Sequence, residues 1–301
     1  MKARILVSAA ALLLAFSCTK ENSSDVQSYT FSLAGTLEEL DVMQETKVTL
    51  AHTMKMSWTK GDKVSVVNLT KGKALGGSLT ADQDATKSTF SGTVTGHIDD
   101  GDVLFLIYPD LGYISEQDFI NAKVDFSSQD GTDKNAKFCA ISRIEPVLDG
   151  NFIYGDTYFT MKSGMINITL ADLPANTTID EVHIENLYSE ISLSINSAKS
   201  DIVITGTEGT ISMYPNSKTS VHGTKGLYFG LGGARSVSAR RKVSVICGDD
   251  IYESDMTNGA IGSKFYTLSI GAFSKKNVTG GFNIVYDDTD MEEGETINLG
   301  E

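Results

Sequence analysis

The stretch Tyr29-Thr30-Phe31-Ser32-Leu33 alternates apolar and polar side chains, and this alternation decides the fold. A period of two residues is typical of a β-strand that buries one face and exposes the other to water. The same pattern recurs along the chain at residues 64–66, 124–126, 166–170, 182–184, 191–195, 211–213, 243–245, 266–270 and 282–286. Residues 103–108, Val-Leu-Phe-Leu-Ile-Tyr, are apolar throughout and indicate a strand buried on both faces.

Turn residues separate these segments. Clusters of Gly, Asn and Asp, which tolerate positive φ, lie at residues 59–62, 99–102, 149–151 and 257–259. No segment of twelve or more residues has a convincing helical period. Short strands with turns about every 8–12 residues predict β-sandwiches. The chain is long for one sandwich, so we expect two in tandem, divided near Met161-Lys162-Ser163-Gly164.

The composition excludes several classes of protein. The chain has 301 residues, of which 41% are hydrophobic and 21% charged, so it contains enough apolar side chains for a sizeable core. Lys plus Arg number 25 against 39 Asp plus Glu, and the net charge of −14 argues against binding nucleic acid. Three cysteines exclude a disulfide scaffold. The four histidines are dispersed, and no metal, cofactor or catalytic motif is found, so we predict no enzyme.

The N-terminus predicts export to the cell surface. Met1-Lys2-Ala3-Arg4 is basic, and the apolar run at 5–16 is too short to cross a bilayer, as in a secretory signal; the alternative is a buried N-terminal helix. Ala15-Phe16-Ser17-Cys18 resembles a bacterial lipobox, in which Cys18 becomes the first mature residue and carries acyl chains such as palmitate. More than one chain gives stable anchoring. Lys20-Glu21 matches part of the Bacteroidetes surface-export signal.

Three features each have two interpretations. Trp58, the only tryptophan, is expected in the core, with a sugar-binding platform as the alternative. Cys139 and Cys247 are expected to be small buried hydrophobes, with a disulfide between them as the alternative. The last fifteen residues contain seven acids and no base between Asp287 and Glu301, which indicates a solvated tail; a loose calcium site is the alternative.

Seven motifs follow one another over residues 46–270. They are Thr46-Lys47-Val48-Thr49-Leu50, Met56-Ser57-Trp58-Thr59-Lys60-Gly61-Asp62-Lys63-Val64-Ser65-Val66, Phe90-Ser91-Gly92, Leu106-Ile107-Tyr108-Pro109, Met165-Ile166-Asn167-Ile168-Thr169-Leu170, Gly248-Asp249-Asp250-Ile251-Tyr252 and Gly262-Ser263-Lys264-Phe265-Tyr266-Thr267-Leu268. In this order, and after a lipobox, they resemble the Bacteroidales fimbrillin family, whose members build type V pili.

This resemblance implies an all-β fold of two tandem transthyretin-like, Greek-key β-sandwiches after a lipoprotein signal peptide. It also implies that proteolysis removes the first strand and that a neighbouring subunit's tail strand replaces it by β-strand addition. The cleavage position matches Lys47, and the donor strand would present Phe282, Ile284 and Tyr286. The best-known members are cut after Arg, which this chain lacks between Arg4 and Arg143. Either a Lys-tolerant protease acts, or the strand stays in place.

We therefore expect five segments. They are a signal peptide over 1–17, a flexible linker after the lipidated cysteine over 18–27, an N-terminal sandwich over 28–162, a C-terminal sandwich over 163–275, and a tail over 276–301 with the donor strand and the acidic end.

The expected function is that of a non-enzymatic fimbrial subunit or adhesin at the outer membrane surface or in a fimbrium. Its partners would be other fimbrial subunits, in a homo- or hetero-polymer, the outer membrane through the lipid, and a host protein or glycan receptor. The alternative is a stand-alone glycan-binding surface lipoprotein, which needs exposed aromatic platforms. An enzyme is the third hypothesis.

Overall fold

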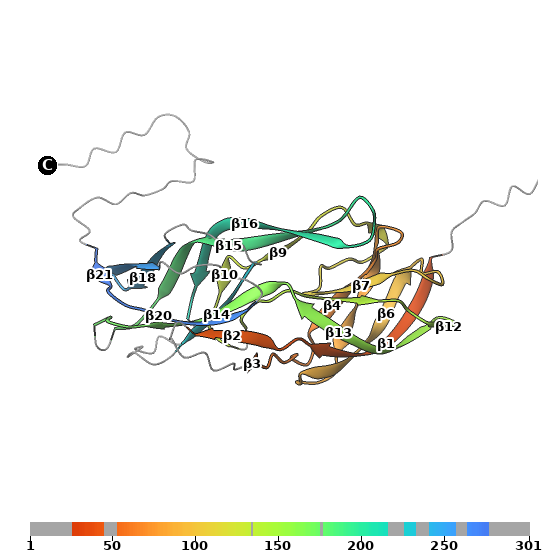
Figure 1. The fold of residues 1–301 in the computed structure, drawn as a ribbon, viewed down its shortest axis with the longest axis horizontal. Helices are drawn as coiled ribbons and strands as arrows, with labels where there is room; N and C mark the ends of the chain where they lie inside the picture. Colours follow the sequence, from red (N-terminus) through yellow and green to blue (C-terminus); the bar gives the residue numbers. More distant parts are fainter. Residues whose placement is uncertain are drawn as a thin grey trace, which may run out of the picture.

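The structure is a computed structural model that describes residues 26–44, 53–133, 135–174, 177–215, 226–232, 241–256 and 264–276. Within these ranges the chain forms β-strands and no helix, so the all-β, sandwich-type prediction is confirmed. The strands form an elongated molecule, with β1, β6 and β13 at one end and β18, β20 and β21 at the other (Figure 1).

The first sheet closes into a ring. Its strands are β1 (Gln27–Leu37), β6 (Lys87–Gly96), β5 (Lys73–Ala81), β4 (Lys63–Asn68), β7 (Leu104–Tyr108), β11 (Ala140–Ile144) and β13 (Phe152–Met161), with β8 (Gln117–Asp118) beside β5 and β12 (Leu148–Asp149) beside β13. Because β1 pairs antiparallel with β6 and parallel with β13, the two ends of the sheet meet. We call these seven main strands the N-terminal ring.

Two further sheets form the other half of the molecule. One contains β10 (Ser128–Gln129), β16 (Ile202–Met213), β15 (Glu181–Ile195), β18 (Arg241–Cys247), β19 (Asp250–Met256) and β21 (Ser274–Lys275), with β9 (Ala122–Asp125) beside β15. The other contains β17 (Leu227–Gly232), β14 (Ser163–Leu170), β20 (Phe265–Ile270), β2 (Leu40–Gln44) and β3 (Thr53–Met54).

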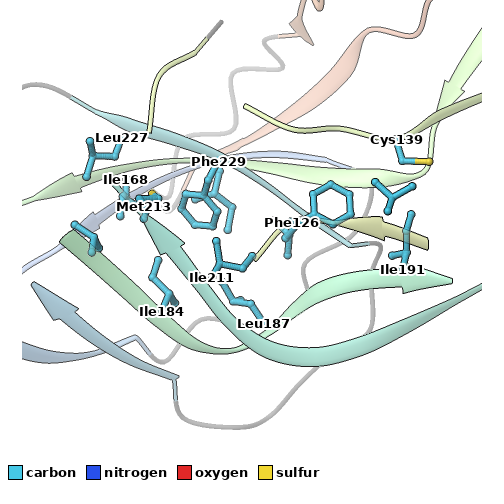
Figure 2. Packing of buried hydrophobic residues seen from close by; sticks show 14 of the residues in the cluster. Phe126, Cys139, Ile168, Ile184, Leu187, Ile191, Ile211, Met213, Leu227 and Phe229 are labelled. Atoms are coloured by element: carbon cyan, nitrogen blue, oxygen red, sulfur yellow. The ribbon is translucent and has the colours of Figure 1, made fainter. Parts of the chain in front are cut away.

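These two sheets bury a common core. Ile168 of β14 and Phe229 of β17 face Ile184 of β15 and Ile211 of β16, as Figure 2 shows. All four side chains are fully buried. Alternating apolar residues on both sheets therefore build the interior, as a period of two residues dictates.

The two halves share strands. β2 and β3 precede β4 in sequence but pair with the sheet of β20, and β9 and β10 precede β11 but pair with β15 and β16. The expected boundary between residues 162 and 163 falls between β13 and β14. The division into two separate domains stays a prediction.

Gln129 of β10 forms hydrogen bonds that hold one of these shared segments in the other half of the molecule; we call this segment the Gln129 crossing. Its side chain is 6% exposed, and its Nε2 atom donates to the carbonyl oxygens of Phe126 (3.0 Å) and Gly230 (2.7 Å). Its Oε1 atom accepts from the backbone N–H groups of Lys137 (3.0 Å) and Gly230 (2.8 Å). One buried amide thus satisfies four backbone groups of β17 and the crossing segment.

The two cysteines do not form a disulfide. Cys139 is fully buried in the core shown in Figure 2, and burial raises the pKa of its thiol to about 12. Cys247 is half-buried, and burial raises its pKa to about 11. The expectation of a buried hydrophobe holds for Cys139 and was wrong for Cys247.

Candidate functional site

The residues that the sequence singles out for function lie outside the described residues. These are Cys18, Lys47, Phe282, Ile284 and Tyr286. Lys47 lies in the sequence between Gln44, where β2 ends, and Thr53, where β3 begins. The candidate site that the structure does describe is β1, which cleavage at Lys47 would detach together with β2.

β1 buries one complete face. Tyr29, Phe31, Leu33 and Leu37 are each exposed by 2% or less and pack in the interior of the N-terminal ring. The Tyr29 hydroxyl donates to the Ile98 carbonyl at 2.8 Å and accepts from the Ile98 N–H at 3.2 Å. The intervening residues of β1 face outward, which is the period-two pattern predicted from the sequence.

Both edges of β1 are occupied. Thr36 to Gln27 pair with Lys87 to Gly96 of β6, and Thr30 to Leu37 pair with Phe152 to Phe159 of β13. Removing β1 would therefore open the ring between β6 and β13. We call the space that β1 fills the first-strand groove.

Gly35 lies at a crowded position of the ring interior. A Cβ atom there would lie 2.9 Å from Phe159 Cε2 and 2.9 Å from two ring carbons of Phe90. Real Cβ atoms do not approach other carbons this closely, so this position of the groove accepts only glycine without displacement of the rings.

Trp58 closes the groove from inside. Its side chain is 1% exposed, and its ring centroid lies 4.8 Å from that of Phe90 and 4.9 Å from that of Phe159, both edge-on. Its Nε1 atom donates a hydrogen bond of 3.1 Å to the carbonyl oxygen of Gly35. The core interpretation of Trp58 is confirmed, and the one tryptophan of the chain contacts β1 directly.

The turn after Trp58 has the chemistry its sequence indicates. Gly61 has φ of +97°, and the Asp62 carboxylate accepts the Thr59 N–H at 2.8 Å. The Tyr108 hydroxyl donates to the other carboxylate oxygen at 3.2 Å. Burial raises the pKa of Asp62, and burial together with the adjacent carboxylate raises the pKa of Tyr108. The turn thus positions Trp58 against β1.

The described residues contain no candidate metal site and no membrane-spanning helix. Over these ranges, no group of three His, Cys, Asp or Glu side chains could hold a metal ion. These ranges also contain no helix that is long and apolar enough to cross a membrane.

Comparison with known proteins gives a likeness of fold. No family model matches the chain, and no curated protein matches it. The structure of a "putative cell adhesion protein" from Bacteroides ovatus superposes with a TM-score of 0.51 at 12% identity, over 83% of this chain and 96% of that one.

Two further structures are similar to a lesser degree. Another "putative cell adhesion protein", from Bacteroides uniformis, gives a TM-score of 0.48 at 18% identity, over 79% of this chain and 96% of that one. A fimbrial assembly protein from Parabacteroides distasonis gives 0.40 at 12% identity, over 81% and 92%. The Bacteroides ovatus match establishes a shared fold. The predicted resemblance to the fimbrillin family is thereby confirmed as a likeness of fold to this "putative cell adhesion protein" of Bacteroides ovatus.

Proposed function

We propose that this protein is a non-enzymatic fimbrial subunit or adhesin at the bacterial cell surface. It is exported with a signal peptide and anchored in the outer membrane through Cys18. It assembles by β-strand addition, in which a neighbouring subunit's tail fills the first-strand groove after cleavage at Lys47. The observation that carries the proposal is the position of β1, which is paired on both edges and buried on one face.

The emptied groove would be a strong binding site. Burying an aliphatic or aromatic side chain contributes about 1.5–3 kcal/mol, so the four apolar side chains of β1 contribute on the order of 6–12 kcal/mol. This is comparable with the whole stability of a domain, about 5–15 kcal/mol. The unpaired backbone groups of β6 and β13 would add main-chain hydrogen bonds and would otherwise invite aggregation. A subunit without β1 therefore needs a replacement strand.

The predicted donor has the side chains that the groove accepts. From its C-terminal to its N-terminal end, every second residue of the tail reads Tyr286, Ile284, Phe282, Gly280, Val278. The inward residues of β1, in chain order, read Tyr29, Phe31, Leu33, Gly35, Leu37. A donor strand running opposite to β1 would thus place an aromatic at the first position, a glycine at the fourth and an aliphatic at the last.

The opposite direction fits poorly. In the register that keeps Val278 first and Tyr286 last, Ile284 would take the place of Gly35, where even a Cβ lies 2.9 Å from Phe90 and Phe159. Shifting the strand by one residue would turn Asn283 inward. We therefore propose a donor antiparallel to the original direction of β1, with Gly280 at the position of Gly35.

Two adjacent glycines provide the test. Gly280→Val places a branched side chain against Phe90 and Phe159, whereas Gly281→Val places it on the outer face. We expect Gly280→Val to abolish SDS-resistant oligomers and surface filaments and Gly281→Val to leave them intact. Deletion of residues 278–301 should act like Gly280→Val. Equal effects of the two valine variants would refute the register, and oligomers that survive the deletion would refute tail-strand addition.

The native N-terminus separates the pilus subunit from the alternative. Mass spectrometry of the sheared surface fraction should find a terminus at Val48. An acylated Cys18 as the sole terminus, found with membranes alone, would mean that β1 stays in place. The protein would then be a stand-alone surface lipoprotein, and the closed ring with β1 in position is the observation that favours this second candidate.

A further inference from the structure

The outer face of β13 carries a row of exposed aromatic side chains. Phe152, Tyr154 and Tyr158 are 59%, 61% and 55% exposed, whereas positions 153, 157 and 159 of the same strand are buried. Outward positions of a half-buried strand are normally polar. Three large exposed rings on one strand therefore indicate a binding surface. We call these three residues the aromatic row.

The neighbouring strand, β1, has small outward side chains beside the aromatic row, so the rings project above it. In the parallel pairing, Thr30 lies opposite Phe152, Ser32 opposite Tyr154 and Thr36 opposite Tyr158. The next strand, β6, continues the outer surface with Thr93, Ser91, Thr89 and Lys87. Hydroxyl groups thus border the row on the side of β1, which pairs with both β6 and β13. We call them the hydroxyl bed.

Charged groups interrupt the row at its middle. Asp156 lies between Tyr154 and Tyr158 on the same face and accepts a hydrogen bond of 2.6 Å from Lys87 Nζ, which reaches over β1. The two side chains are 77% and 57% exposed, so their remaining hydrogen-bonding capacity faces solvent. Rings spaced along the strand therefore alternate with a hydrogen-bonding pair.

A cavity lies at the Tyr158 end of the row. It has a volume of about 340 Å³, and its lining includes Tyr158, Thr160, Arg143, Lys162 and Asp201. Hydrogen-bond donors and acceptors thus converge beside the last ring. Because Ile202 and Ile204 of β16 also line it, this cavity lies where the N-terminal ring faces the other half of the molecule.

We propose that the aromatic row binds a chain of neutral pyranose sugars. The C–H face of a pyranose is apolar and carries partial positive charge, which suits the negative face of an aromatic ring. Its equatorial hydroxyl groups need in-plane donors and acceptors, which Lys87, Asp156 and the hydroxyl bed supply. The cavity beyond Tyr158 holds the terminal sugar.

Other occupants fit this surface less well. A second copy of the chain would need a large continuous apolar patch, whereas the three rings of the row are interrupted by the exposed ion pair between Asp156 and Lys87. An extended peptide needs a free strand edge, and the edges of β13 are paired with β1, β11 and β12.

The inference does not depend on polymerisation. β13 keeps its outward side chains whether β1 or a donor strand fills the groove. In the antiparallel register proposed above, the donor would present Val285, Asn283, Gly281 and Thr279 next to the row. These residues are small or polar, so the bed beside the rings would persist in a filament.

The test uses the purified full chain and an array of neutral oligosaccharides of three to six pyranose units. Hits are measured again in solution by titration calorimetry, where we expect dissociation constants on the order of 10 µM to 1 mM. Tyr154→Ala and Tyr158→Ala should each weaken binding about threefold to tenfold, and Tyr154→Phe should retain it. Tyr214→Ala is the matched control, because Tyr214 is 44% exposed at the end of β16 in the other half.

Every outcome decides the proposal. Unchanged emission from buried Trp58 establishes that each variant is folded. No hit at millimolar sugar, or binding that survives loss of both tyrosines, would overturn the sugar site. A concentration-dependent dimer in sedimentation velocity that Tyr154→Ala abolishes would assign the row to a second copy instead.

Discussion

Replacing Gly35 by valine tests the crowding on which the proposed donor register depends. A Cβ at this position lies 2.9 Å from ring carbons of both Phe90 and Phe159, and neither ring has solvent beside it to move into. The Trp58 ring packs against both phenyl rings, at centroid distances of 4.8 and 4.9 Å, and prevents them from moving away from a side chain at position 35. Ala34, the preceding residue, faces outward and is half-buried, so Ala34→Val is the matched control.

The magnitude follows from two opposing effects. Overpacking a core costs about 1–3 kcal/mol, and the branched side chain of valine places Gly35→Val at the upper end. Loss of the flexible glycine from the unfolded chain offsets about 0.4–1 kcal/mol. The steric clash outweighs this offset, so we expect the free energy of unfolding to fall by about 2 kcal/mol. Ala34→Val should stay within about 0.5 kcal/mol of the wild type, because valine suits an outward strand position.

Urea unfolding followed by Trp58 fluorescence measures the loss directly. With an m-value of about 3 kcal/mol/M, the midpoint should fall by about 0.7 M in Gly35→Val and by less than about 0.2 M in Ala34→Val. Phe159→Leu in the Gly35→Val background should recover part of the loss, with a coupling energy of about 1 kcal/mol. Equal midpoints for the two valine variants would refute the reasoning, because the rings would then yield and Gly280 would have no special place in a donor strand.

Two further predictions concern the Gln129 crossing and one surface ion pair. Gln129→Leu leaves the N–H groups of Lys137 and Gly230 and the Gly230 carbonyl without their buried partner. The free energy of unfolding should therefore fall by about 2–4 kcal/mol in the same urea assay. A loss below about 1 kcal/mol would contradict this prediction. The hydrogen bond from Lys71 lowers the pKa of Asp99 below its ordinary value of 3.8. The stability that this pair contributes is therefore complete above the ordinary pKa and is lost as the pH falls through the lowered pKa. The wild type should therefore unfold at higher urea than Lys71→Met at pH 7, with the difference shrinking below about pH 4; a difference independent of pH would refute the pair.

Alternation in the sequence was sufficient to find the strands with one wet face. β1, β14 and β18 lie where the period of two residues predicts them. β4 also lies at its predicted place, but the expected wet face is wrong there, because Ser65 is fully buried. Residues 103–108 were expected to be buried on both faces, and residues 104–107 are buried without exception. The predicted strands at 182–184 and 191–195 form one strand, β15, because two bulges carry it past Asn186, whose φ is +56°.

Alternation missed several strands, among them β13 with its exposed aromatic side chains. β13 has Phe152, Tyr154 and Tyr158 outside and Ile153 and Phe159 inside, so both faces read as apolar and no period of two residues appears. β6 fails for the opposite reason, since Ser, Thr and Gly fill most of its positions. The contact between Trp58 and Gly35 joins residues 23 apart in sequence through tertiary packing, which no local pattern encodes.

In the proposed assembly, the closed N-terminal ring would protect the sheet edges of the subunit during export and would still allow strand addition after cleavage. A sheet edge that is ready for strand addition also pairs with any other edge it meets, so an exported subunit with an open groove would aggregate. β1 removes that edge by pairing with both β6 and β13, and its glycine and apolar side chains match the interior closely. The same match makes β1 slow to leave while it is covalently attached, because its own chain holds it at high effective concentration. Cutting the chain near Lys47 would end that advantage and let a similar pattern of side chains from a neighbour compete for the first-strand groove. In this proposal the difference between a monomeric surface lipoprotein and a filament subunit lies in one peptide bond, and the fold serves both.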